Sequence, residues 1–212
     1  MKQKVHVYEK PFPHLIVEEM YNSEELFLIW EELNFLTKPG KLWDAEKHLA
    51  SKDNGKYQTE SKAIFLDYLY SERSASNILS VNRKLYNGPY TKVFSEIAPH
   101  CALATRSNYD LTKVRYYHHD DYYEPHIDTT FDFISFTYFH KKPKKFSGGE
   151  LFFPQYDYEF ECNNNSMIII PSYVEHGVKN VLVTDSDYYD GYGRYCMTQF
   201  FASVPAQLLK NK

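Results

Sequence analysis

Apolar positions at helical spacing mark one segment within the first forty residues. Asn22 or Ser23 would cap the start of a helix there, with Glu25 as the reciprocal partner of the cap. The pair Pro39-Gly40 would follow its end. The apolar side chains recur at intervals of three and four residues, which is one face of an α-helix; they are Leu26, Ile29, Trp30 and Leu33. The pattern therefore predicts a first helix that ends before Pro39.

A second helical region is expected between Ser74 and Pro99. Ser74 or Ser76 would cap it, and Asn87-Gly88-Pro89 would divide it into two pieces. Its apolar positions are Ile78, Leu79, Leu85, Val93, Phe94 and Ile97. Outside the helices, Val5–Val17 predicts an extended segment or edge strand interrupted by prolines, and Ala63–Asp67 predicts a short strand.

From Leu103 onward the pattern changes to short apolar runs separated by turn residues. The runs that predict strands are 111–117, the run that carries His126, 131–140, 150–154, 158–162, 166–170, 178–183 and 195–203. Many short strands at regular intervals are typical of a β-sandwich or jelly roll. The sequence thus predicts a mainly β protein with N-terminal helices, in which residues 1–102 support a jelly-roll core at 103–203 within a single domain, 1–212.

Composition agrees with a β-rich core and narrows the classes of partner. The chain has 20 tyrosines and 15 phenylalanines, and aromatic residues favour strands. Its formal net charge of −4 gives no reason to expect a nucleic-acid partner, because nucleic-acid readers are usually basic. The 3 cysteines form no CxxC pair, which favours a reducing compartment. No signal peptide or long apolar run is present, so we expect a soluble, cytoplasmic protein without membrane contact.

Three residues form a candidate metal site. His126 and Asp128 are two positions apart, and in an extended chain such side chains point to the same face. His176 lies 176 − 128 = 48 residues further on, after the apolar run Met167–Pro171. Two histidines and one carboxylate suit non-heme Fe(II) with open positions. A zinc hydrolase could use the same ligand types, so the three residues leave both metals open.

A fourth element adds more information. Arg194 begins the strand-like run 194–201, and an arginine fork is the natural bidentate partner of a carboxylate. His-x-Asp, then His, then Arg, in this order, resembles the 2-oxoglutarate-dependent Fe(II) oxygenases, and their prolyl-hydroxylase branch most of all. The resemblance runs from about Leu111 to Phe201. It departs from the family between His176 and Arg194, which are 194 − 176 = 18 residues apart, with the loop 185–191 as extra length.

The resemblance implies a double-stranded β-helix (jelly-roll) core flanked by helices, and further site residues. Tyr116, ten residues before His126, Tyr138 and Thr198 stand where the family lines its 2-oxoglutarate pocket, and Phe146–Pro154 carries its Ser-Gly-Gly turn. His126, Asp128 and His176 would hold Fe(II), and Arg194 would anchor 2-oxoglutarate. Together with O2 these would hydroxylate a C–H bond, with L-ascorbate keeping the iron reduced.

A prolyl residue in a peptide or protein is the substrate that the resemblance implies, and a free amino acid is the second option. A nucleic-acid demethylase shares the triad, but its usual second arginine is replaced by Gln199-Phe200. Outside the enzymes, the chain could be a non-catalytic, cupin-like metal-binding module. The sequence does not indicate an oligomeric state.

Several site residues have competing interpretations. His118-His119-Asp120-Asp121 contains two further His-x-Asp pairs, which we interpret as a solvated corner between strands. Arg194 could instead pair with Asp187 or Asp190 in a surface ion pair. Tyr123, three residues before His126, is a weaker candidate for the pocket wall. The loop 188–192 could close over a substrate as a lid, or it could be an ordinary exposed insertion.

Overall fold

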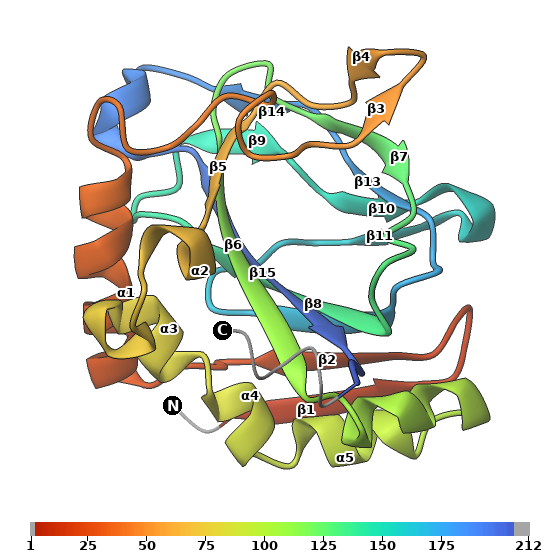
Figure 1. Ribbon diagram of the computed structural model, residues 1–212. Coiled ribbons are helices and arrows are strands. Elements are labelled where there is room, and N and C mark those ends of the chain that lie inside the picture. Colours follow the sequence, from red (N-terminus) through yellow and green to blue (C-terminus); the bar gives the residue numbers. More distant parts are fainter. Residues whose placement is uncertain (1–2, 206–212) are drawn as a thin grey trace.

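The computed structural model describes residues 3–205, and Figure 1 shows two antiparallel sheets that face each other. The large sheet has the order β1-β2-β12-β8-β15-β6-β5, and the smaller sheet has the order β11-β10-β13-β7. Two short pairs, β14-β9 and β3-β4, accompany them. This is the mainly β, jelly-roll architecture that the strand pattern predicts.

The strands are β1 (Lys4–Tyr8), β2 (His14–Glu18), β3 (Lys52–Asp53), β4 (Lys56–Tyr57), β5 (Lys62–Phe65), β6 (Tyr109–Tyr117), β7 (Tyr123–His126), β8 (Phe133–Phe139), β9 (Phe146–Gly148), β10 (Leu151–Phe153), β11 (Tyr158–Phe160), β12 (Met167–Pro171), β13 (His176–Val178), β14 (Val181–Val183) and β15 (Arg194–Ala202). The helices are α1 (Ser23–Leu36), α2 (Leu66–Leu69), α3 (Asn77–Val81), α4 (Lys84–Asn87) and α5 (Tyr90–Ser95), with 3-10 segments η1 (Arg73–Ala75), η2 (Pro99–Thr105), η3 (Pro154–Tyr156) and η4 (Tyr188–Asp190).

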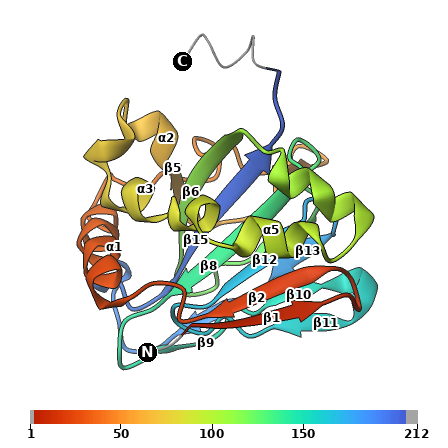
Figure 2. The same cartoon turned by 90° about the horizontal axis from the view of Figure 1, so that it is seen from below.

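The helices cover one face of the large sheet, as Figure 2 shows for α1, α3 and α5. Helix α1 begins at the predicted cap, where Asn22 and Glu25 form a reciprocal capping box. Its buried face carries Ile29, Leu33 and Leu36, which join the apolar cluster between helices and sheet. The predicted first helix is therefore confirmed.

The second helical region is also present, in three pieces. Ser76 caps α3 by accepting a hydrogen bond from Leu79 N at 3.0 Å. Buried Glu32 of α1 accepts hydrogen bonds from the Ser76 hydroxyl and from Ile78 N, so it ties the two helices together. The chain breaks again at Gly88-Pro89 before α5, as the turn residues predict.

Strand β15 lies at the centre of the large sheet, paired with β8 on one side and β6 on the other. Its side chains alternate between two apolar clusters, because successive residues of a strand point to opposite faces. Cys196 and Phe200 belong to the cluster between the two sheets, whereas Tyr195 and Met197 belong to the cluster under the helices. The alternation fixes which residues can reach the space between the sheets.

Two local predictions need correction. The strand expected at 63–67 ends at Phe65, and Leu66–Leu69 forms the short helix α2. The strand expected at 178–183 is divided into β13 and β14, which belong to different sheets. The break comes at residues 179–180, where Lys179 N bonds to Glu150 O and Val181 N bonds to Asp121 O. Both differences come from long-range pairing, which local apolar runs do not encode.

The first hundred residues also contribute strands to the large sheet. β1 and β2 extend it beyond β12, and β5 extends it beyond β6. The predicted division at residue 102 therefore separates segments that share one sheet. No helix within residues 3–205 is long and apolar enough to cross a membrane.

Candidate active site

The three predicted metal ligands lie together at one end of the smaller sheet. His126 ends β7 and His176 begins β13, and the antiparallel pairing sets them directly opposite each other. Asp128 follows β7 by two residues, with its Oδ2 3.5 Å from His176 Nε2 and 4.0 Å from His126 Nε2. One ligand atom from each residue lies within 4.8 Å of the others, and within residues 3–205 no other group of three His, Cys, Asp or Glu side chains meets this arrangement.

Each histidine is oriented by its own backbone. His126 Nδ1 lies 2.9 Å from Glu124 O, and His176 Nδ1 lies 2.9 Å from Val174 O. A carbonyl can only accept, so both Nδ1 atoms donate and both Nε2 atoms keep a free lone pair toward Asp128. Burial, followed by the neighbouring His176, holds the pKa of His126 well below its usual range. The donor set is thus two imidazole nitrogens and one carboxylate, which fits Fe(II).

Aromatic rings hold the triad from two sides. The ring of Tyr123 stacks on that of His126, with centroids 3.9 Å apart and planes inclined by 20°. Phe136 of β8 meets His176 edge-on at 5.1 Å. The Tyr123 hydroxyl also bonds to Ser51, through Ser51 N at 3.2 Å and Ser51 Oγ at 3.1 Å. Tyr123 therefore links the triad to the segment that precedes β3, and its predicted place at the pocket wall is what the geometry shows.

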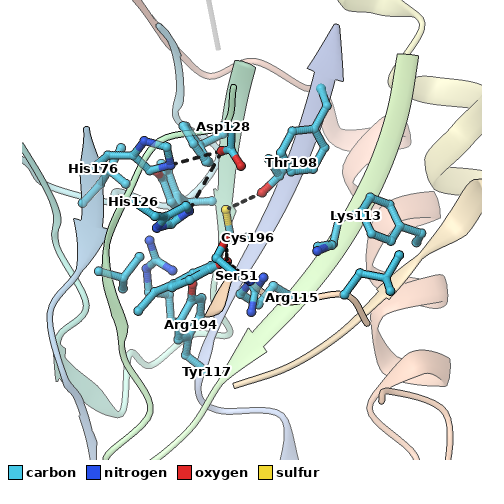
Figure 3. A pocket seen from close by; sticks show the side chains of 18 of the residues that line it. Ser51, Lys113, Arg115, Tyr117, His126, Asp128, His176, Arg194, Cys196 and Thr198 are labelled. Atoms are coloured by element: carbon cyan, nitrogen blue, oxygen red, sulfur yellow. Dashed lines mark hydrogen bonds and ion pairs between the residues drawn. The ribbon is translucent and has the colours of Figure 1, made fainter. Parts of the chain in front are cut away.

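A cavity between the two sheets opens onto the triad (Figure 3). It is reached by side chains from β6, β8 and β15 of the large sheet and from β7, β10 and β13 of the smaller one. Its apolar walls are Leu49, Phe65, Phe131, Phe136, Leu151, Val178 and Phe200, and its polar lining includes Ser51, Lys113, Arg115, Tyr117, Tyr123, Tyr138, Arg194 and Thr198.

Arg194 enters this cavity below the triad (Figure 3). Its guanidinium lies 4.8 Å from the ring centroid of Tyr117 and 4.7 Å from that of Tyr138. Nη2 donates to Cys162 Sγ at 3.2 Å, whereas Nε and Nη1 are buried without a hydrogen-bond partner. A buried guanidinium with two unused donors indicates an anionic ligand in the cavity. The surface pairing of Arg194 with Asp187 or Asp190 is wrong, because Arg194 is only 1% exposed and contacts neither carboxylate.

Of the other predicted pocket residues, two line the cavity and one does not. Tyr138 and Thr198 line the cavity. Tyr116 does not, because it faces the helices, where its hydroxyl donates to Tyr188 O at 3.1 Å and accepts from Gly193 N at 3.0 Å. The neighbouring Tyr117 faces the cavity instead. Spacing from His126 selected Tyr116, but the pairing of β6 with β15 determines which tyrosine points inward.

Two cavity residues were missed by the sequence reasoning. Lys113 and Arg115 precede Tyr117 at intervals of two on β6, and they face the cavity opposite Thr198 and Cys196 of β15. The signal was present in the alternation Lys113-x-Arg115-x-Tyr117, which places all three side chains on one face of a strand.

The rival His-x-Asp pairs lie elsewhere. His118-His119-Asp120-Asp121 forms the corner between β6 and β7, where the Asp121 carboxylate accepts from His118 N at 2.7 Å and Asp120 is in the left-handed region with φ 64°. The loop 185–191 does not line the cavity. Its Tyr188 packs edge-on against Tyr116 at 5.0 Å, next to the helix-covered face.

Comparison with known proteins agrees with this geometry. Residues 111–202 match the sequence model of the 2OG-Fe(II) oxygenase superfamily. No curated protein sequence matches the chain. Among solved structures, a Pseudomonas putida prolyl-4-hydroxylase superposes with a TM-score of 0.63 at 12% identity, covering 91% of this chain and 93% of that one.

Two further prolyl hydroxylases are similar in fold. One is a Trichoplax adhaerens prolyl hydroxylase in complex with a hypoxia inducible factor oxygen degradation domain peptide fragment, with a TM-score of 0.59, 11% identity and coverage of 90% and 83%. The other is the viral collagen prolyl hydroxylase of Paramecium Bursaria Chlorella virus-1, as its 2OG complex, with a TM-score of 0.51, 11% identity and coverage of 90% and 96%. At these identities the likeness shows a shared fold.

Proposed function

We propose that this chain is a member of the 2OG-Fe(II) oxygenase superfamily, whose sequence model matches residues 111–202, and that it hydroxylates a C–H bond of a prolyl residue in a peptide or protein. The overall reaction converts substrate, 2-oxoglutarate and O2 into hydroxylated substrate, succinate and CO2. The observation that carries the proposal is the convergence of the His126–Asp128–His176 triad and the unpaired donors of Arg194 on one cavity.

In this proposal the triad holds Fe(II), which supplies the oxidative chemistry when bound together with 2-oxoglutarate and O2. The hydrogen bonds from Nδ1 of His126 and His176 to backbone carbonyls fix both rings in the metal-binding tautomer. Three protein ligands on one side leave the remaining positions open for other molecules. L-Ascorbate would serve as the external reductant that keeps the metal ferrous.

Arg194 orients the cosubstrate. Its guanidinium, in which Nε and Nη1 are not used by protein partners, would receive the far carboxylate of 2-oxoglutarate through two adjacent N–H groups on one edge. Tyr117 and Tyr138 flank the guanidinium and restrict its movement, and Thr198, on the same face of β15, adds a hydroxyl to the lining. The arginine is pre-positioned before the cosubstrate arrives, which lowers the entropy lost on binding.

The remaining walls exclude water from the reacting centre. Phe136, Leu151 and Val178 are buried apolar side chains that line the cavity from three different strands. A dry cavity strengthens the ion pair to Arg194 and prevents side reactions. The prolyl substrate is supported by the fold shared with the prolyl hydroxylases, one of which holds a peptide fragment.

The test is succinate formation from 2-oxoglutarate under air, with Fe(II) and L-ascorbate, in the presence and absence of proline-containing peptides. We expect turnover by the wild type that a peptide increases, and none by Asp128→Ala. Asp120→Ala is the matched control, since it removes an exposed carboxylate from the rival His-x-Asp corner. Equal inactivity of the wild type and Asp128→Ala, with metal bound and the fold intact, would favour a non-catalytic metal-binding module instead.

A binding measurement separates the cosubstrate from the metal. With Mn(II) in place of Fe(II), calorimetry should show that Arg194→Met raises the dissociation constant of 2-oxoglutarate by about 100-fold, the effect of truncating one partner of a buried charge pair. Arg194→Lys should recover only part of this affinity, because an ammonium cannot form the bidentate pair.

A further inference from the structure

All the buried lysine and arginine side chains in residues 3–205 line the same cavity. They are Lys113, Arg115 and Arg194, which are 5%, 4% and 1% exposed. None of them has a carboxylate within ion-pair distance in that part of the chain. Burying an unpaired charge costs free energy that a fold does not tolerate without reason. Their gathering at one cavity therefore indicates that anions bind there.

The proposed function accounts for only one of these three cations. Bound 2-oxoglutarate and Asp128 carry negative charge that offsets Fe(II) and Arg194. Lys113 and Arg115 are then left without a counter-charge, in a space where charges interact strongly because the dielectric is low. A second anionic group would compensate charge that the proposed function leaves unpaired.

Contacts of its guanidinium with two tyrosine rings show where Arg115 lies relative to the metal ligands. Its guanidinium is 4.6 Å from the ring centroid of Tyr123, which stacks on the metal ligand His126. It is also 5.9 Å from the ring centroid of Tyr117, which in turn lies 4.8 Å from the guanidinium of Arg194. Nη1 donates to Ser61 Oγ at 2.7 Å, a neutral partner that fixes the group but leaves its charge uncompensated.

Lys113 occupies the part of the cavity that is lined by phenylalanines. Its Nζ lies 4.1 Å from the ring centroid of Phe65, and Phe65, Phe200 and Phe131 contact one another in a row. Figure 3 shows Lys113 and Arg115 side by side on β6, across the cavity from the triad. A ligand that reaches both cations would place an apolar body against these rings.

We propose that Lys113 and Arg115 bind a carboxylate of the substrate to be hydroxylated, and so hold its apolar C–H bond toward the triad. The proposal rests on the proposed function for the identity of the reaction, but the pairing of cations with a carboxylate is separate from it. The carboxylate has two sources with the same chemistry: the side chain of an acidic residue beside the target in a peptide, or the α-carboxylate of a free amino acid.

Calorimetry on the full chain loaded with Mn(II) and saturated with 2-oxoglutarate tests the pairing directly. The peptide arm compares end-blocked peptides in which glutamate precedes or follows proline with the same peptides carrying glutamine. The free amino-acid arm compares L-proline with L-prolinamide. In one arm the carboxylate ligand should bind at least about tenfold more tightly than its amide, as charge-assisted hydrogen bonds require.

Four variants test which residues cause the carboxylate preference. Lys113→Met and Arg115→Met replace the cations with apolar side chains of similar length, and each should reduce the carboxylate preference. Lys142→Met removes a positive charge from an exposed turn and should keep it. Arg115→Lys keeps the charge without the fork and should retain an intermediate preference, which also shows that the position tolerates substitution.

Two results of the carboxylate comparison would overturn the inference: no carboxylate preference in either arm, or a preference that survives both Lys113→Met and Arg115→Met. It would also be overturned if Arg115→Met weakened the binding of 2-oxoglutarate as strongly as Arg194→Met does, since Arg115 would then bind the cosubstrate and not the substrate. Succinate formation by a wild type without carboxylate preference leaves the proposed function standing. A carboxylate preference without succinate formation would support the pairing of Lys113 and Arg115 with a carboxylate, and would contradict the proposed hydroxylation.

Discussion

Gly149 lies directly against the side chain of Arg194. A Cβ atom at position 149 would come within 2.8 Å of Arg194 Cδ and 3.4 Å of Nε. Gly149 also has φ +76°, a backbone conformation that residues other than glycine rarely adopt. The Ser-Gly-Gly turn before β10 thus determines the space in which the guanidinium lies.

Gly149→Ala should therefore weaken 2-oxoglutarate binding. The methyl group would displace Arg194 from its place between Tyr117 and Tyr138, and we expect the KM for 2-oxoglutarate to rise by at least about tenfold. The left-handed backbone should add about 1–2 kcal/mol of destabilisation. Steady-state kinetics and urea unfolding measure the two effects separately.

Gly40→Ala is the control for the backbone cost. Gly40 has the same φ of +76°, but a Cβ there meets nothing within 4 Å. This variant should show the destabilisation without the change in KM. If both variants raise the KM equally, the effect comes from general loosening of the fold and not from contact with Arg194.

Tyr116 and Tyr117 should respond to mutation in opposite ways. Tyr117→Leu removes one of the two rings that flank Arg194, and the KM for 2-oxoglutarate should rise by about tenfold, as expected for loss of a desolvated cation–π contact. Tyr116→Phe breaks the hydrogen bonds to Tyr188 O and Gly193 N, and should cost about 2 kcal/mol of stability with an unchanged KM. The reverse result would restore the assignment that spacing suggested.

His48 should make stability depend on pH. Burial, followed by Arg115 and Lys113, lowers the pKa of His48 from 6.5 to about 3. The unfolded chain binds a proton between these values and the folded chain does not, so stability is present above pH 6.5 and is lost as pH falls below it. His48→Gln should flatten this slope by up to about 1.4 kcal/mol per pH unit.

Urea unfolding of the metal-free protein between pH 7 and pH 5 measures the slope. His119→Gln is the control, because it removes an imidazole from the exposed corner between β6 and β7. A slope that His48→Gln leaves unchanged would assign the pH dependence to other histidines, such as His126.

Lys113→Met should stabilise the protein at neutral pH. Burial, followed by Arg115, holds the pKa of Lys113 well below its usual range. At neutral pH, protonation of this lysine therefore stabilises the unfolded state more than the folded state. The apolar variant removes this penalty, and we expect a gain of about 1–3 kcal/mol. Because the unfolded lysine loses its proton near pH 10.4, the gain should shrink as the pH rises toward that value.

Thermal and urea unfolding of Lys113→Met beside Lys142→Met at several pH values would measure the gain. A loss of stability in Lys113→Met would mean that this lysine holds the fold together, and that its place in the cavity does not reflect a ligand.

The sequence by itself determined the helix caps, the strand-rich second half and the order of the metal ligands. These features are local: Asn22 and Glu25 form their capping box within one turn, and His126 and Asp128 share a face because they are two residues apart. The order of His126, Asp128, His176 and Arg194 was enough to indicate a resemblance to the superfamily, and residues 111–202 match its sequence model. The roles of the individual site residues remain predictions.

Only the tertiary structure decided which side chains of β6 face the cavity. A shift of one residue moves every side chain of a strand to the other face, and the pairing of β6 with β15 turns Lys113, Arg115 and Tyr117 inward while Tyr116 faces the helices. It also decided that Lys113, Arg115 and Arg194 share one space without counter-charges. Charges that meet through pairing between distant strands leave no local pattern, so the sequence shows three basic residues but not their common cavity.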